Sequence, residues 1–296
     1  MSEKILGIDV SRWQGKIDWH TVARAGYTFA VLRATSGNYY TDPTFYINWR
    51  DATEAGLALS AYHVVVPGIP AQAQIDRFFS ALDGRQAAFP LVLDVEMDKT
   101  RDKKPVTAAQ LTPLVAECAQ LAAALDGRNP IIYTGVWFWN SKIQRSDDWA
   151  QYDLWVASYG GSQPALPADW QEWRFWQTTN EGKVPGVTSK FTDLDEFNGS
   201  EAEFAQYLSQ PAKKPDRPAK PAPSPKQSSP RLTGRIIAAQ LNVRAGPGLN
   251  YDIVDTLKPG DKVEVFDVNG RDAWIKIGPD RWTAVTINGN LFLEIE

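Results

Sequence analysis

Two carboxylates stand at the end of an apolar run near the middle of this 296-residue sequence. The run is Leu91-Val92-Leu93-Asp94-Val95-Glu96, and its composition predicts a buried strand. Side chains alternate across a strand, so Asp94 and Glu96 point to the same side. Acids inside an apolar strand cost free energy unless they are paired or face a cleft. Two facing carboxyl groups are the minimal equipment for cutting a glycosidic bond, although a capping or salt-bridged pair gives the same pattern.

The elements that must position this pair form a repeating pattern. Through residue 140, apolar runs alternate with helix-like segments, and three more strands follow with little room for helices between the last two. Five β-α units and three strands predict an α/β fold, a flattened and incomplete (β/α) barrel with its site at the C-terminal ends of the strands. The expected strands are residues 5–10, 29–34, 57–65, 89–96, 131–134, 154–159, 173–178 and 191–197.

This architecture predicts that three further acids lie near the pair. Asp9 closes the first expected strand, and Asp193 and Asp195 lie in the last one. First and last strands are neighbours in a barrel, so these side chains can meet Asp94 and Glu96 in one cleft. A single Asp at a strand end is more often a helix cap than a catalyst, and that alternative stays open.

Residues 108–126 show the apolar spacing of a helix that ends at Gly127. Its start is ambiguous, because Thr107 with Gln110 fits a capping box while Thr112-Pro113 fits a cap followed by proline. Cys118 falls on the apolar face and is expected in the core. It is the only cysteine, so no intramolecular disulfide can form.

Histidine and cysteine are too scarce for common metal chemistry. The chain has two histidines and one cysteine, so we expect no metal and no cofactor. His63 is expected to be a hydrogen-bonded structural residue.

Composition predicts two domains. Residues 211–230 contain seven prolines and five Lys or Arg against one Asp, which is typical of a semi-extended linker. We therefore expect domains at residues 1–210 and 232–296, joined by a linker at 211–231. The positive charge of the linker favours a role in solubility, and weak attraction to anionic wall polymers is the alternative. No other segment of the chain is basic enough to predict nucleic-acid binding. The sequence has no run of about 18 apolar residues for a membrane span and no secretory signal at its start.

The motifs of the first domain resemble glycoside hydrolase family 25, the Chalaropsis-type lysozymes found as bacterial autolysins and phage endolysins. The resemblance runs in order from about Lys4 to Leu208. It implies cleavage of the β-1,4 bond between N-acetylmuramic acid and N-acetylglucosamine in bacterial peptidoglycan. The motifs are GIDVSRWQG, Ala61-Tyr62-His63, LVLDVE, Ile132-Tyr133-Thr134, LWVASY, Phe175-Trp176-Gln177 and TDLDEFNG.

Carried over onto this sequence, the resemblance implies roles for individual residues. Glu96 is the expected catalytic acid, Asp94 its partner carboxylate, and Asp9 and Asp193 the flanking acids, while Asp195 is expected in a supporting position as a substrate-binding residue. Crowded carboxyl groups raise the proton affinity of Glu96, as an acid catalyst requires. Aromatic side chains suit the apolar faces of sugars, and those near strand ends in matching motifs are the expected substrate-binding residues: Tyr62, Tyr133, Trp155 and Trp176.

The C-terminal region reads as an all-β module. Its expected strands are punctuated by Gly246-Pro247-Gly248, Pro259-Gly260 and Asn269-Gly270. From about Thr233 to Glu296 it resembles bacterial Src-homology-3-like domains, which implies a small barrel that binds cell walls; no ligand residues are assigned. The expected strands are residues 235–239, 241–244, 262–268, 274–277 and 282–285.

Together these features predict a monomeric muramidase that acts on the bacterial cell wall, outside the cell or at lysis. Two alternatives stay open, a wall-binding protein with a catalytically silent barrel and a chitin-directed hydrolase. The intact acids argue against a silent barrel, whereas chitin shares the acetamido sugar of peptidoglycan.

Overall fold

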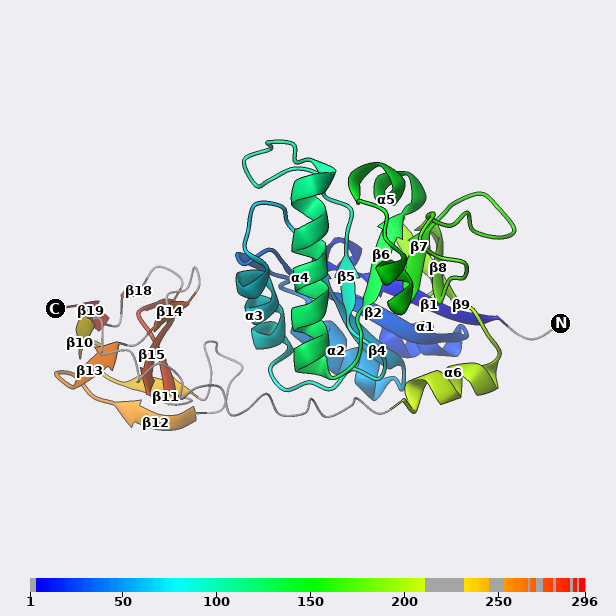
Figure 1. Cartoon of the computed structure of the whole chain (residues 1–296). Helices are drawn as coiled ribbons and strands as arrows, with labels where there is room; N and C mark the ends of the chain where they lie inside the picture. The colour runs from blue at the N-terminus through cyan, green and yellow to red at the C-terminus, as the bar shows by residue number, and fades with distance from the viewer. Residues whose placement is uncertain are drawn as a thin grey trace. The chain divides into compact units, whose positions relative to one another are not determined.

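The computed structural model describes residues 4–210, 232–244, 253–265, 267–269, 274–278, 281–287, 290–291 and 293–295. The chain divides into two compact units, Met1–Asp216 and Arg217–Glu296 (Figure 1). This division falls inside the predicted linker at 211–231, which lies outside the described residues. The domain limits 1–210 and 232–296 stay predictions.

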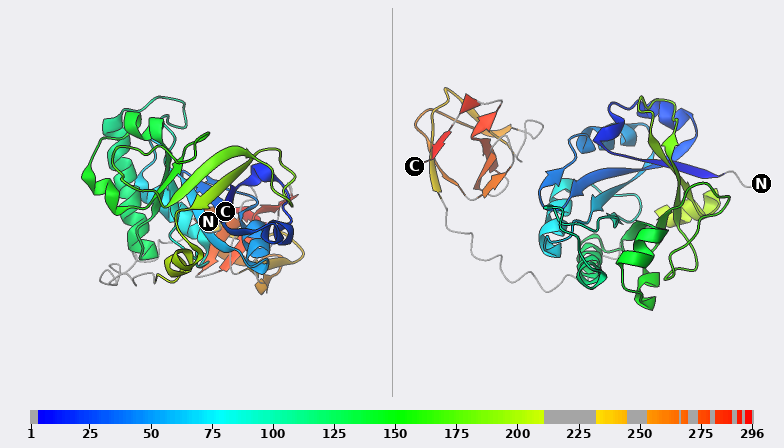
Figure 2. Two further views of the ribbon diagram at one scale, coloured as in Figure 1. Left: turned by 90° about the vertical axis from the view of Figure 1, so that its right-hand side faces the viewer. Right: turned by 90° about the horizontal axis from the view of Figure 1, so that it is seen from above.

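Strands of the first unit close into a barrel (Figure 2). Nine strands form one sheet, and β1 pairs with both β9 and β2, so that all but the short β3 lie in a closed ring. Around the ring, the strand pairs from β1 to β8 are parallel, while β9 is antiparallel to both neighbours. The short β3 pairs antiparallel with β2. The strands are β1 Ile5–Val10, β2 Tyr27–Ser36, β3 Tyr40–Thr41, β4 Ala58–Val64, β5 Val92–Asp94, β6 Ile131–Gly135, β7 Leu154–Ala157, β8 Phe175–Gly182 and β9 Thr192–Phe197.

Helices follow the first five parallel strands of the ring, and the 3-10 turn η2 (Asp147–Gln151) lies between α5 and β7. No helix separates β7, β8 and β9, all of whose connecting residues the structure describes. The predicted barrel of five β-α units plus three strands is confirmed. It is incomplete in its helical layer, whereas its sheet is hydrogen-bonded all round. The helices are η1 Arg12–Gln14, α1 Trp19–Arg24, α2 Phe45–Glu54, α3 Ala71–Leu82, α4 Ala108–Asp126, α5 Val136–Lys142 and α6 Glu201–Leu208.

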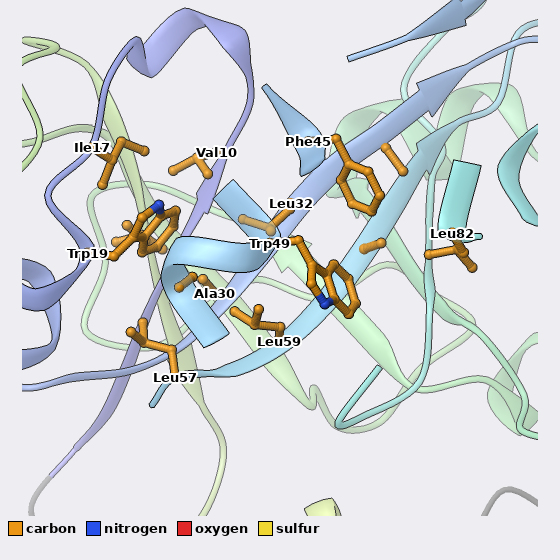
Figure 3. Packing of buried hydrophobic residues seen from close by; sticks show 14 of the residues in the cluster. Val10, Ile17, Trp19, Ala30, Leu32, Phe45, Trp49, Leu57, Leu59 and Leu82 are labelled. Atoms are coloured by element: carbon orange, nitrogen blue, oxygen red, sulfur yellow. The ribbon is translucent and has the colours of Figure 1, made fainter. Parts of the chain in front are cut away.

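Alternation along the strands divides the apolar residues between two layers. In β2, Ala30 and Leu32 point outward and pack with Trp49 and Phe45 of α2 (Figure 3). Phe29 and Val31 point inward, into the barrel. One strand therefore serves both the helix-covered core and the barrel interior, which is why its sequence reads as a continuous apolar run.

Aromatic residues fill the N-terminal end of the barrel. Phe204 and Tyr207 of α6 reach into the base, where Phe204 lies 4.9 Å from Phe197 and Phe29 lies 5.3 Å from Phe175, measured between ring centroids. A capping box between Ser200 and Glu203 starts α6. This aromatic plug leaves open only the end at which the parallel strands finish.

The start of α4 resolves the ambiguity in the sequence. Thr107 and Gln110 form the capping box, and Pro113 lies inside the helix. Cys118 is buried in the core as predicted, and burial raises the pKa of its thiol to about 12. By length and composition alone α4 could cross a membrane, and one face of it packs into the barrel's helix layer through Leu111, Val115, Cys118 and Ala122.

The second unit consists of short β-strands, which confirms the all-β prediction. They form sheets in the orders β13-β10-β19 and β12-β11-β16-β15-β14, with a β17-β18 pair. The sequence prediction missed β12, β17, β18 and β19 and joined β13 and β14 into one strand at 262–268. Gly246-Pro247-Gly248 lies outside the described residues. The strands are β10 Leu232–Ile236, β11 Leu241–Arg244, β12 Ile253–Leu257, β13 Lys262–Val265, β14 Asp267–Asn269, β15 Trp274–Gly278, β16 Arg281–Ala284, β17 Thr286–Ile287, β18 Asn290–Leu291 and β19 Leu293–Ile295.

Candidate active site

The strand register brings the predicted acids to one end of the barrel. Asp9, near the end of β1, is paired with Asp193 at the start of the antiparallel β9. Asp94 ends β5, and Glu96 follows two residues later on the same side. All four carboxyl groups line a single pocket.

This pocket opens where the parallel strands end. Its volume is about 230 Å³. Tyr62, Tyr133 and Trp155, which we expected to bind substrate, line it together with the acids. The remaining lining residues are Arg33, Tyr159, Gln177 and Asn180.

Asp94 is the most deeply held of these acids. Its side chain is 3% exposed, and its Oδ1 atom accepts no hydrogen bond from the described residues. Burial raises the pKa of Asp94 well above its ordinary value, and the charge of Glu96 adds to that effect while Arg33 opposes it. A buried carboxyl oxygen without a partner is costly, so a ligand that supplies a donor here would be favoured.

Glu96 is the most open of the four acids. Its side chain reaches solvent, yet the pocket walls desolvate the carboxyl enough to raise its pKa, which positively charged Arg33 opposes. Burial and the charge of Glu96 together raise the pKa of Asp193 to about 6. These acids therefore hold protons at a pH where isolated carboxyl groups have lost them.

Gln177 fixes the surroundings of Asp9. Tyr133 and Tyr159 both donate their hydroxyl hydrogens to Gln177 Oε1, at 3.0 and 2.6 Å. The amide nitrogen must then face Asp9, and it donates to Asp9 Oδ2 at 2.7 Å. Burial and the charge of Asp193 raise the pKa of Asp9, and this hydrogen bond counteracts them.

Arg33 is the cation among the lining residues. Its guanidinium carbon lies 5.2 Å from the centroid of the Tyr62 ring. Sequence reasoning missed Arg33, although it continues the inward alternation of Phe29 and Val31. It also missed the roles of Tyr159 and Gln177, which stand in the quoted motifs, and of Asn180, for which the sequence carries no signal.

Asp195 supports the pocket from behind. It is 1% exposed and does not line the pocket, but Trp155 Nε1 donates to its Oδ1 at 3.0 Å. Burial raises its pKa well above the ordinary value, with Asp9 and Asp193 adding to the shift. Asp195 therefore orients the indole ring of Trp155.

Trp176 is not in the pocket, which corrects its predicted position. Its side chain belongs to the outer core, where it contacts Trp173, and its Nε1 donates to the Ser158 carbonyl at 2.6 Å. The neighbouring residue Gln177 takes the inward position of β8. Side chains alternate along the strand, so both residues cannot face the same cleft.

His63 is structural, as predicted. Its Nδ1 lies 2.7 Å from Thr35 Oγ1 and its Nε2 lies 3.3 Å from Gln74 Oε1, both in the buried outer layer. Burial lowers its pKa to about 4. Within the described residues, no group of three or more His, Cys, Asp or Glu side chains is arranged to hold a metal ion.

An open-ended α/β barrel with facing carboxyl groups, some of which retain protons, is the equipment of a glycoside hydrolase. The family model described as "Glycosyl hydrolases family 25" matches residues 8–187, and the chain belongs to this family. A model described as "Bacterial SH3 domain" matches residues 239–288 in the second unit.

Several known proteins are similar to the chain. "Lysozyme M1" of Streptomyces globisporus is 34% identical over 207 residues, covering 67% of this chain and 69% of that protein. The bacterial lysozyme structure from Streptomyces coelicolor is 32% identical, with a TM-score of 0.65 over 73% of this chain and 100% of that one. A family 25 glycosyl hydrolase structure from Bacillus anthracis is 29% identical, with a TM-score of 0.62 over 70% of this chain and 94% of that one.

Proposed function

We propose that this enzyme is a muramidase that cleaves the β-1,4 bond between N-acetylmuramic acid and N-acetylglucosamine in bacterial peptidoglycan. The observation that carries the proposal is the convergence of Asp9, Asp94, Glu96 and Asp193 on one pocket. Relatives named as lysozymes and an N,O-diacetylmuramidase from Chalaropsis support this choice of substrate.

Glu96 is the general acid in this proposal. Departure of the leaving sugar requires a proton on its oxygen, so the donor must stay protonated near the working pH. Glu96 has a raised pKa and is the most solvent-accessible of the four acids, so a leaving group at the pocket mouth can reach it.

Asp94 is placed to engage the 2-acetamido group of the substrate. Its buried Oδ1 lacks a donor, and an acetamido N–H would supply one. This contact would orient the acetamido carbonyl oxygen to attack the anomeric carbon, so that no enzyme nucleophile is needed. Asp9 and Asp193, where ionised, would stabilise the positive charge that develops at that carbon.

The catalytically silent barrel and the chitin-directed hydrolase are the two alternatives to a muramidase. A silent barrel would not require four carboxyl groups with raised pKa values around one cavity. A chitin-directed hydrolase would use the same acetamido chemistry, and only the products distinguish it.

Digestion of purified peptidoglycan tests the proposal directly. The products are reduced with borohydride and the new reducing ends are identified by mass spectrometry. Muramic acid ends are expected. Glucosamine ends, or undigested walls with rapid cleavage of chitin oligosaccharides, would refute the muramidase assignment.

For the second unit we propose attachment of the enzyme to the cell wall, supported by its match to the bacterial SH3 domain. The enzyme would then act as a monomer at the wall, outside the cell or at lysis, with no role for nucleic acid or a membrane span.

A further inference from the structure

Two groups of stacked aromatic and cationic side chains lie on loops at the barrel end where the pocket opens. The guanidinium carbon of Arg12 lies 4.5 Å from the ring centroid of Trp13 and 5.5 Å from that of Tyr40. The next residue back, Tyr39, is stacked in the same way with Arg101, at 4.6 Å. We call these five residues, Arg12, Trp13, Tyr39, Tyr40 and Arg101, the aromatic–cationic rim.

The rim lies at the same barrel end as the candidate active site. Its residues come from the segments that follow β1, β2 and β5, at the barrel end where the pocket opens. Asp9 and Asp94 line the pocket from the ends of β1 and β5, so two of the rim's segments follow strands that carry pocket residues. In Figure 1 the segment between β5 and α4, which carries Arg101, rises above the barrel.

The rim is held by the fold on the β1 side. The Arg12 backbone N–H donates to buried Asp42 at 3.0 Å, and the buried Gln14 side chain donates to the Phe191 carbonyl at 3.1 Å. These bonds use backbone atoms or other side chains, so the Arg12 guanidinium and the Trp13 indole remain available. Trp13 is 67% exposed.

On the β2 and β5 side, glycines allow the loops to pack closely. A Cβ atom at Gly37 would meet Tyr39 and Ile69, and one at Gly68 would meet Thr100. Both glycines have positive φ angles, which other residues adopt only with strain. The loop with Arg101 is thereby held against the loop that precedes α3, next to Tyr39.

The two arginines of the rim form no ion pair with another described residue, and the loop that carries Arg101 holds four Lys or Arg against Asp98 and Asp102 between residues 98 and 104. None of the ion pairs among the described residues involves Arg12, Arg101, or the exposed Lys99, Lys103 and Lys104 of the same loop. Residues 1–210 as a whole carry 18 Lys or Arg against 25 Asp or Glu, so this positive stretch opposes the charge of its own domain. Clustered cations of this kind attract an anionic ligand.

We propose that the rim is an extended binding surface for the anionic substituents of the peptidoglycan strand. Trp13 and the tyrosines would contact sugar faces outside the cleaved disaccharide, while Arg12 and Arg101 would pair with carboxylates of the lactyl groups and stem peptides. This inference rests on the proposed muramidase function. It adds that the enzyme distinguishes strands by their charge, through residues outside the catalytic pocket.

The test compares two substrates in the full-length enzyme. Soluble glycan strands with free carboxylates are assayed beside the same strands after their carboxylates are coupled to methylamine. The variants are Arg12→Gln with Arg101→Gln, and separately Trp13→Ala. The matched control is Arg85→Gln, because Arg85 also stacks on a tyrosine, Tyr46 at 4.8 Å, but precedes β5 at the opposite end of the barrel.

The double arginine variant should raise KM for charged strands about fivefold at low salt, from two exposed charge contacts, and the effect should shrink as salt increases. On the amidated strands, the difference in KM between the double arginine variant and Arg85→Gln should be markedly smaller. Trp13→Ala should raise KM for both substrates, because sugar stacking does not depend on the carboxylates. Binding of fluorescent strands, measured by anisotropy, provides a readout that needs no turnover.

Equal KM and equal salt dependence for the double variant and Arg85→Gln would overturn the rim proposal, as would equal losses on both substrates. Competition by purified teichoic acid as strong as that by the charged strands would assign the rim to a phosphate polymer and also overturn it. If wild-type enzyme binds the strands but cleaves neither form, the muramidase function fails while the anisotropy comparison still decides the rim.

Discussion

Asp9 and Asp193 are paired across the β1–β9 ladder, and after burial the charge of Asp193 is the largest cause of the raised pKa of Asp9. The two carboxyl groups therefore cannot both ionise cheaply at neutral pH, since like charges at close range disfavour each other. Glu96 in turn raises the pKa of Asp193. Protonation at one member of this group thus changes the proton affinity of the next.

Replacing Glu96 by Gln should lower kcat on peptidoglycan at least roughly 100-fold, because the proton donor is lost with little change in size. Asp94→Asn should also be severe. The measurement is release of reducing ends from purified walls, with circular dichroism and wall co-sedimentation as controls for folding and binding. Activity of Glu96→Gln within about tenfold of wild type would reject Glu96 as the acid.

Asp193 should make the barrel less stable at neutral pH than in mild acid. Its pKa is raised to about 6, so the native state binds more protons than the unfolded chain between about pH 4 and pH 6, and stability falls as pH rises through that window. Asp193→Asn should make this slope shallower, with a gain of about 1 kcal/mol at pH 7 after allowance for its partial exposure. Asp9, Asp94 and Asp195, whose pKa values are also raised, keep the rest of the slope. Urea unfolding of wild type and variant at about pH 4 and pH 7 measures this dependence of stability on pH. An equally steep dependence in the variant would contradict the prediction.

His63 should have the opposite effect on stability. Its pKa is lowered to about 4, so the unfolded state binds more protons between that value and the ordinary 6.5, and stability is lost as pH falls through this window. His63→Asn retains a partner for Thr35 and should flatten the acid limb of the stability curve. The comparison is the change in unfolding midpoint from about pH 7 to about pH 4.5. If the variant loses as much stability as wild type over this pH range, groups other than His63 cause the loss of stability in acid.

Residues 1–210 alone should cleave soluble muropeptide oligomers like the full chain but lose efficiency on whole walls, because a tethered binding unit raises the local enzyme concentration. Turbidity loss of intact walls and product release from oligomers are measured in parallel. Equal rates on walls with and without the second unit would argue against a targeting role.

The reaction should retain the anomeric configuration. The acetamido oxygen attacks the anomeric carbon from the face opposite the leaving sugar, and water then attacks from the face that the sugar has left, which gives two inversions and no covalent sugar–enzyme adduct. Proton NMR of the anomeric signal during early hydrolysis should show the β-product first. The α-product first would instead indicate direct attack by water, directed by Asp9 or Asp193.

Local patterns in the sequence were enough to predict the barrel and its acids. The apolar spacing of residues 108–126 matches the limits of α4. Asp9 and Asp94 meet at one mouth because parallel strands place their C-termini together, and Asp193 joins them from the start of the antiparallel β9. The predicted strand at 89–96 is shorter in the structure, since Phe89 turns into the plugged base and Glu96 extends beyond the ladder.

The rest of the site depends on contacts that no local pattern contains. Gln177 gains its role from Asp9, Tyr133 and Tyr159, which are 168, 44 and 18 residues away in the sequence. Trp176 was misplaced by a single position, because an apolar run buried on both faces does not reveal which of two neighbours points inward. The stacking of Arg12 on Tyr40 likewise joins loops that only the folded barrel brings together.

The aromatic plug formed by Phe29, Phe197 and the α6 residues Phe204 and Tyr207 also decides the route of a polymer through the enzyme. A barrel sealed at its base has no exit for a threaded chain, so a long glycan must lie across the entrance and leave by the side from which it came. Such an enzyme needs no free chain end and can cut within a continuous network.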